Sequence, residues 1–181
     1  ESGSWIGKAM FETNYVVGAL RAAAAAAYQV NGEILPSEGG KLSMVIRQPL
    51  GVVSVISPWN FPELLSCRGF AVAMAVGNCI VLKPSEETPY SGGLLFAELF
   101  EEVGLPAGVL NVVPCSREMV AEVGDEMVVN PSIKAISFTG STAVGRLIAE
   151  KIMRKQLHVR IIICSMCHKL IVLRPILFFP I

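Results

Sequence analysis

Residues 52–83 have the sequence VVSVISPWNFPELLSCRGFAVAMAVGNCIVLK, and this stretch decides the fold class. The apolar run 52–56 predicts a buried strand, residues 63–76 predict a helix, and residues 79–82 predict a second buried strand. Pro, Gly and Asn residues bound these segments, which is typical of turns between them. A strand, a helix and a strand in this order indicate a right-handed βαβ unit with parallel strands.

The same alternation continues along the chain. Residues 91–103 predict a helix, 109–113 a short strand, 119–129 a weaker helix, 133–138 a strand and 143–155 a helix. We therefore expect an α/β fold, a Rossmann-like parallel sheet with helices on both faces. Ligands of such sheets bind outside the carboxyl ends of the strands, so the residues that follow each strand are the candidates for chemistry.

The chain upstream predicts a long helix and a pair of strands before this sheet. Residues 4–30 are rich in Ala, the best helix former, and Gly32 follows where a helix would end. Residues 42–47 and 52–56 are both β-rich. Pro49, Leu50 and Gly51 separate them, which predicts a kink or turn between two strands.

The amino-acid composition argues against nucleic-acid binding and against a membrane-spanning segment. The 181 residues carry 15 Lys+Arg and 15 Asp+Glu, a net charge of zero, and are 52% hydrophobic. This chain is long enough for one ordinary domain. Without a dense basic block we expect no nucleic-acid partner. Lys169 and Arg174 break the longest apolar stretches before the roughly 18 residues that a membrane span requires, so we expect no membrane segment.

The cysteines and the N-terminus indicate where the protein works. The five cysteines are an odd number scattered through apolar segments, which favours free thiols in a reducing compartment, and the cytoplasm fits best. No charged and apolar leader precedes the fold, so no secretory signal is expected. The first residue is Glu1 instead of Met, which indicates a fragment.

A carboxamide follows the first strand of the predicted sheet. Asn60 lies in Ser57-Pro58-Trp59-Asn60-Phe61-Pro62, a loop that two prolines stiffen. A side-chain N–H on a rigid loop can stabilise a developing oxyanion. The alternative is an Asn that only caps the following helix.

A cation and a carboxylate follow the second strand. Lys83 and Glu86 are three residues apart at the sheet edge, where both can hold the hydroxyls of a ribose. The alternative is a solvated salt bridge, with Glu86 or Glu87 helping to begin the next helix.

A turn of small residues follows the strand 133–138. Residues 139–145 read Thr-Gly-Ser-Thr-Ala-Val-Gly and begin a helix, whose free N–H groups and positive dipole end suit a phosphate. The spacing G-x-x-x-x-G is neither the dinucleotide fingerprint nor a P-loop. An ordinary N-cap turn is the alternative. The connection 104–108 carries no reactive group and is interpreted as structural.

Together these segments resemble the aldehyde dehydrogenase superfamily in order and spacing, over about residues 3–151. The motifs are Pro58-Trp59-Asn60-Phe61-Pro62, Lys83-Pro84-Ser85-Glu86 with Thr88-Pro89, Gly104-Leu105-Pro106 with Gly108-Val109 and Asn111-Val112-Val113, and Phe138-Thr139-Gly140-Ser141-Thr142 with Val144-Gly145. The resemblance implies a truncated aldehyde dehydrogenase fold, with residues 1–151 as part of its NAD(P)-binding domain. It also implies oxidation of a small-molecule aldehyde to a carboxylic acid through a cysteine thiolate, with NAD or NADP. A homo-oligomer is implied for the full-length family member.

The resemblance also implies roles for individual residues. Asn60 would donate to the oxyanion, and Lys83 and Glu86 would hold the adenosine ribose. The backbone of Ile56 and Trp59 would line the cofactor cleft. The helix opening at Gly140, Ser141 and Gly145 would approach the pyrophosphate, with Val144 near the adenine. Residues 39–49 look most like members that act on aromatic aldehydes such as benzaldehyde or vanillin. Glu86 would repel a 2′-phosphate and Lys83 would attract one, so NAD and NADP both stay open.

The chain departs from the family after Lys151. Residues 152–181 form a divergent apolar tail with no acidic residue, where the family has a strand ending in Glu-Leu-Gly-Gly-Lys that provides the general base. None of the five cysteines lies in the family's Gly-Gln-x-x-Cys context, and Cys67, Cys79 and Cys115 are interpreted as core residues. We therefore expect this chain to lack the catalytic Cys and Glu and to be inactive alone. The alternative is a non-catalytic nucleotide-binding fragment or a truncated gene product.

A second pattern lies in the tail. Residues 164–168, Cys-Ser-Met-Cys-His, match the C-x-x-C-H pattern of c-type haem attachment. That attachment follows export, and no signal is present, so haem is not expected. A zinc site would need a second pair of ligands, and we expect no metal.

Overall fold

The protein has a central sheet whose strands follow the order β5-β4-β3-β6-β7-β8. The computed structural model describes residues 1–154, 160–165 and 170–172. Within these residues, five strands are parallel, and β8 (Leu170–Val172) runs antiparallel to β7. The parallel strands are β3 (Val52–Ile56), β4 (Cys79–Lys83), β5 (Leu110–Val112), β6 (Ile133–Gly140) and β7 (Arg160–Ser165).

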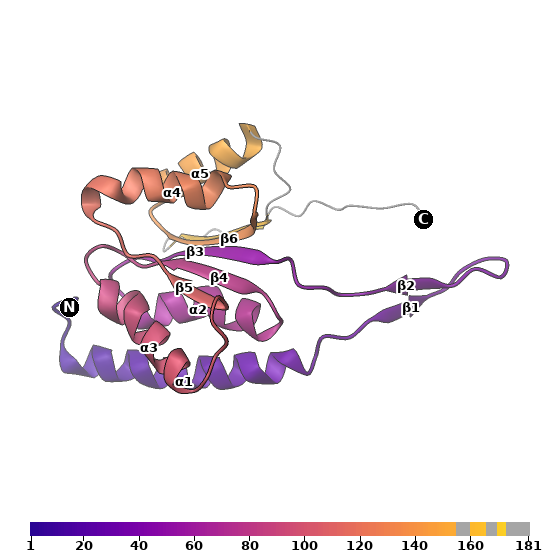
Figure 1. Ribbon diagram of the computed structural model, residues 1–181, viewed down its shortest axis with the longest axis horizontal. Coiled ribbons are helices and arrows are strands. Elements are labelled where there is room, and N and C mark those ends of the chain that lie inside the picture. The colour runs from indigo at the N-terminus through magenta and orange to yellow at the C-terminus, as the bar shows by residue number, and fades with distance from the viewer. Residues whose placement is uncertain (155–159, 166–169, 173–181) are drawn as a thin grey trace.

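Helices cover both faces of the sheet (Figure 1). One layer holds α1 (Ile6–Ala27), α2 (Pro62–Ala75) and α3 (Leu95–Glu102), and the opposite layer holds α4 (Val120–Val129) and α5 (Thr142–Arg154). A short π-helix, η1 (Tyr90–Leu94), leads into α3, and a 3₁₀ turn, η2 (Arg117–Met119), leads into α4. The α/β class and the helices on both faces are confirmed.

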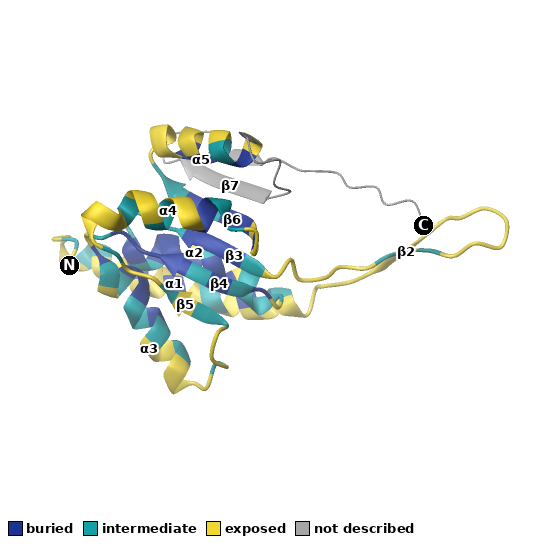
Figure 2. Cartoon of the chain, turned by 45° about the horizontal axis from the view of Figure 1, so that its top comes forward, coloured by how far each residue is buried: buried dark blue, intermediate teal, exposed yellow. Residues whose placement is uncertain are grey.

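The middle strands form the core, where Figure 2 shows mostly buried residues. Under α2 the ring of Phe70 meets Phe96 and Phe100 edge to face, with centroids 5.0 and 6.0 Å apart. Gly69 brings α2 close to the sheet, since a Cβ there would lie 2.5 Å from Cγ1 of Val55. A second cluster under α4 and α5 contains Val128, Ile133, Ile136, Phe138, Ile148 and Ile152.

The chain order creates a topological switch at the centre of the sheet. From β3 the chain builds β4 and β5 on one side, and it then crosses to β6 and β7 on the other. A crevice forms where two such halves diverge, at the carboxyl ends of the strands. The crevice therefore lies between the ends of β3 and β6. No helix within the described residues has both the length and the apolar character to cross a membrane.

A strand pair precedes the sheet as expected, but its members differ from the prediction. β2 (Ser43–Val45) pairs antiparallel with β1 (Glu33–Leu35), not with residues 52–56, which form the centre of the parallel sheet as β3. The three-residue β1 was too short to give a periodic signal. Asn78 Oδ1 accepts hydrogen bonds from the N–H groups of Leu50 and Gly51 at 2.7 and 3.2 Å, which separates β3 from the hairpin. The hairpin projects as an arm (Figure 1).

The tail is described in part. β7 continues the sheet, parallel to β6. The side chain of Cys164 and the whole of Cys167 and His168 lie outside the described residues, so the C-x-x-C-H pattern stays a sequence observation. In the described portion, no three His, Cys, Asp or Glu residues gather as a metal site would require.

Candidate functional site

A cavity of about 480 Å³ opens at the switch point of the sheet. Its floor is the carboxyl ends of β3, β4 and β6, and α4 and α5 form its walls. Four of the predicted site residues line it: Ile56, Lys83, Glu86 and Val144. Residues from segments as far apart in sequence as β3 and α5 therefore meet in one place, as the strand-end argument expected.

Lys83 is the most unusual of the lining residues. Lys83 is the last residue of β4 and pairs with Ile56 of β3. Only 4% of the residue is exposed. Nζ donates a hydrogen bond to the carbonyl oxygen of Pro84 at 3.2 Å. Among the described residues, Lys83 and Glu86 form no ion pair. The alternative interpretation of Lys83 as part of a solvated salt bridge was therefore wrong. An ammonium has three N–H donors, and it can therefore donate to a ligand in the cavity.

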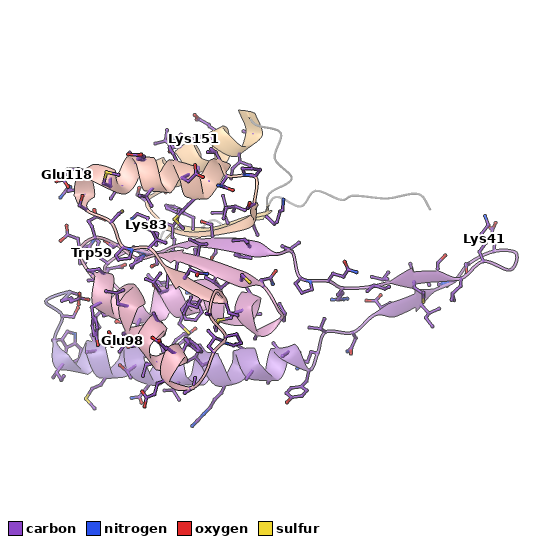
Figure 3. The ribbon with its side chains drawn as sticks, viewed as in Figure 1. Lys41, Trp59, Lys83, Glu98, Glu118 and Lys151 are labelled. Carbon is purple, nitrogen blue, oxygen red and sulfur yellow. The ribbon has the colours of Figure 1, made fainter. Side chains whose placement is uncertain are left out.

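The loop after β3 is held at its first residue. The N–H of Ser57 donates to the carbonyl of Lys83 at 3.2 Å, and the hydroxyls of Ser57 and Ser66 are 2.6 Å apart. Phe61, not Asn60, is the N-cap of α2, so the helix-capping alternative for Asn60 was wrong. Asn60 is half-buried, and Trp59 is exposed. Neither lines the cavity, although Figure 3 shows Trp59 at the same end of the sheet as Lys83.

The turn after β6 is a regular helix start. Ser141 Oγ accepts a hydrogen bond from the N–H of Val144 at 3.3 Å, and the carbonyl of Ser141 accepts one from Gly145 at 3.0 Å. This is the N-cap geometry that the sequence left as the alternative to a phosphate site. Gly140, Ser141 and Gly145 do not line the cavity, whereas Val144 in the first turn of α5 does. A Cβ at Gly140 would lie 2.6 Å from the Phe138 ring, so a larger residue there would require the Phe138 side chain to shift.

Apart from Val144, the residues of the two walls were not predicted from the sequence. They come from α4, α5 and the turn before α4, and the lining side chains are mostly apolar. Lys151 Nζ contacts Asp125 Oδ1 and so joins α5 to α4. In the turn before α4, Arg117 Nη1 lies 4.0 Å from Glu87 Oε1. The apolar faces of both helices were a usable signal, but these residues do not lie at strand ends. The missed lining residues are Arg117, Val120, Ala121, Gly124, Asp125, Val128, Phe138, Leu147, Ile148 and Lys151.

The cavity therefore combines apolar walls with charged groups. Lys83 and Glu86 lie at its strand end, and Arg117, Asp125 and Lys151 lie along the helices. A flat apolar ligand that carries hydroxyl or anionic groups suits such a lining.

The three cysteines whose side chains the structure describes do not add a nucleophile to the cavity. Burial raises the pKa of the Cys67 thiol to about 11, so this side chain stays protonated near neutral pH. Cys67, Cys79 and Cys115 are free thiols, and none of the three lines the cavity. Cys67 is a core residue as predicted, whereas Cys79 and Cys115 are only partly buried and lie outside the core cluster.

Comparison with known proteins gives a family match over most of the chain. The model of the aldehyde dehydrogenase family matches residues 1–172. Vanillin dehydrogenase from Amycolatopsis is 49% identical over 150 residues, and an NAD(+) benzaldehyde dehydrogenase from Pseudomonas putida is 45% identical over 152 residues. Each alignment covers 83% of this chain and 30% of the relative. The chain thus spans about a third of the length of these curated relatives.

Solved structures agree with the sequence match. The NAD-dependent benzaldehyde dehydrogenase from Corynebacterium glutamicum superposes with a TM-score of 0.81 at 42% identity, over 91% of this chain and 34% of that one. A salicylaldehyde dehydrogenase from Pseudomonas putida, solved with salicylaldehyde, gives a TM-score of 0.79 at 36% identity, over 85% and 32% of the two chains.

Proposed function

Since the chain belongs to the aldehyde dehydrogenase family, we propose that it forms the cofactor-binding part of an oxidoreductase that converts an aldehyde to a carboxylic acid with NAD(P). The observation that carries this proposal is the buried ammonium of Lys83 in a cavity at the topological switch of the sheet. A buried cation is costly unless it is paired, and the hydroxyls of a bound ribose give it partners.

The lining suggests how the cofactor lies. Lys83 and Glu86 would hold the adenosine ribose, and Val144 and the apolar side chains of α4 and α5 would hold the adenine; all of these residues line the cavity. Gly140, Ser141 and Gly145 would hold the pyrophosphate at the N-terminus of α5, where the helix dipole favours negative charge. The backbone of Ile56 and Trp59 borders the path toward the nicotinamide. The cofactor, when bound, accepts a hydride from the substrate.

The chain's own contribution to the chemistry is Asn60. Its carboxamide follows β3 on a loop that is fixed at Ser57, and it donates a hydrogen bond to the oxyanion that forms when a thiolate adds to the aldehyde. We assign neither the nucleophilic cysteine nor the general base to this chain. Alone, it binds cofactor without turnover.

The relatives support one cofactor and one substrate class. Two of them are named as NAD-dependent benzaldehyde dehydrogenases, and another is named for vanillin. Glu86 lines the cavity, and its carboxylate would repel the 2′-phosphate of NADP. We therefore favour NAD and an aromatic aldehyde. The free thiols of Cys67, Cys79 and Cys115 suit a reducing compartment such as the cytoplasm.

Calorimetric titration with NAD, NADP and AMP tests the proposal. We expect saturable binding of NAD and AMP and at least about tenfold weaker binding of NADP, the size of one unfavourable charge contact. A folded chain that gives no heat with any of the three would contradict the cofactor site. Reduction of NAD with benzaldehyde by the chain alone would contradict the assignment of nucleophile and base elsewhere.

The arm is the proposed contact with a second copy of the chain. Ile34 and Met44 are cross-strand neighbours on one face of the hairpin. Leu42 and Ile46 are two residues before and after Met44, so the alternation of an extended chain puts them on the same face. All four side chains are exposed. An isolated two-stranded hairpin is marginally stable in water, so a partner that covers this apolar face would stabilise it.

Sedimentation measures this association. We expect the chain to form oligomers and Met44→Lys to shift it to monomers, because the substitution puts a charge on the apolar face. Met10→Lys, which puts the same charge on an exposed position of α1 outside the arm, is the control and should leave the association unchanged. A monomeric parent chain at high concentration would rule out this role for the arm.

A further inference from the structure

A buried carboxylate links α1 to the beginning of α2. Glu12 of α1 is 3% exposed. Its Oε1 accepts a hydrogen bond from the backbone N–H of Leu64 at 3.0 Å, across 52 residues of sequence. Its Oε2 accepts one from Lys8 Nζ at 3.2 Å. This carboxylate lies outside the cavity at the switch point.

The contact with Glu12 gives a hydrogen-bond partner to a backbone N–H group at the N-terminus of α2. The first N–H groups of a helix have no partner within the helix, and the N-cap Phe61 gives no side-chain hydrogen bond. Glu12 therefore acts as a cap from another helix, and its charge is favourable at the positive end of the dipole. Lys8 adds a second contact, because its Nζ lies 4.4 Å from the centroid of the Phe61 ring.

These contacts fix the far end of the loop that carries Asn60. At its near end, Ser57 is hydrogen-bonded to Lys83 and Ser66. At its far end, Phe61 and the first turn of α2 are fixed by Lys8 and Glu12. Asn60 lies directly before Phe61 and so is held between two anchors.

We infer that Glu12 is a positioning residue that sets the orientation of the Asn60 carboxamide through the first turn of α2. The inference rests on the proposed role of Asn60 as oxyanion donor. Such a donor has to be preorganised, since a displacement of about 1 Å can cost about 100-fold in rate. Glu12 itself touches neither substrate nor cofactor.

The orientation can be read in the whole chain by NMR, from the side-chain amide signals of Asn60, which Asn60→Asp identifies by their loss. In Glu12→Ala we expect these signals to move toward their values in unstructured peptides. The Leu64 amide should exchange with solvent about tenfold faster, the size of one lost helix cap. Amides of Ile136 and Ile148, in β6 and α5, should be unchanged.

Two further variants separate positioning from general stability. Glu12→Gln keeps an acceptor at the same reach and should restore most of the Asn60 and Leu64 signals. Thr13→Val is the matched control, because it removes the neighbouring α1–α2 hydrogen bond to Glu63, 3.0 Å long, without touching Leu64. It should leave the Asn60 signals in place. If Glu12→Ala does not fold, Glu12→Asp shortens the reach and keeps the charge, and the same Asn60 shift is expected.

Unchanged Asn60 signals in a folded Glu12→Ala or Glu12→Asp chain would overturn the inference, as would an equal loss of protection in every element. The proposed function fails separately. If NAD does not bind but the Asn60 amide still depends on Glu12, the cofactor site is wrong and the positioning contact stands. If NAD binds and the Asn60 amide ignores Glu12, the reverse holds.

Discussion

Lys83→Met is expected to weaken NAD binding by about 10- to 100-fold, because hydrogen bonds to a charged group are worth about 1.5–3 kcal/mol. The same change should leave the thermal midpoint equal or higher. Methionine fills a similar volume and removes the cost of keeping an ammonium in a site that is 4% exposed. Calorimetry and a thermal melt of the same sample measure both quantities.

Lys41→Met is the matched control for Lys83→Met. Lys41 lies near the tip of the arm, far from the cavity, and its loss should leave NAD binding unchanged (Figure 3). Equal affinity of Lys83→Met and the parent chain would remove Lys83 from the site. A lower thermal midpoint would show that the buried ammonium stabilises the fold.

Phe70→Ala is expected to lower the free energy of unfolding by about 3–5 kcal/mol. Phe70 has no exposed surface and packs edge to face against Phe96 and Phe100, so its removal leaves a cavity between α2 and α3. Domains have about 5–15 kcal/mol of stability in total, and the loss could leave the chain partly unfolded at 37 °C. Urea denaturation followed by circular dichroism measures the change.

Val72→Ala provides the comparison on the same helix. Val72 is exposed on α2, and its truncation should change the stability by less than about 0.5 kcal/mol. Similar losses for Phe70→Ala and Val72→Ala would mean that the cluster under α2 is not the main core.

The order of the elements could be predicted from the sequence because each βαβ step is short and sharply bounded. Residues 52–56 form β3 as predicted, and the helix expected at 63–76 is α2 (Pro62–Ala75). The partner of β2 could not be predicted, since β1 is only three residues long and gives no periodic signal of its own.

The part of the cavity lining that lies at strand ends could be predicted from the sequence. Parallel strands bring Ile56 and Lys83 side by side, so the order of the motifs was enough to place them. The walls from α4 and α5 depend on how these helices pack over the sheet. That packing cannot be predicted from the residues at the strand ends. Glu12 was missed because its partner Leu64 is 52 residues away and a carboxylate within a helix gives no local signal.

The most direct test of the account is to map NAD onto the chain by backbone amide NMR. We expect the largest shifts on addition of NAD at Ile56, Lys83, Val128, Val144 and Ile148, around the cavity at the switch point. We expect no shift in the second cavity, of about 590 Å³, that Val45 and Pro49 line at the base of the arm. Shifts centred on that second cavity, or none at all in a folded chain, would contradict the account.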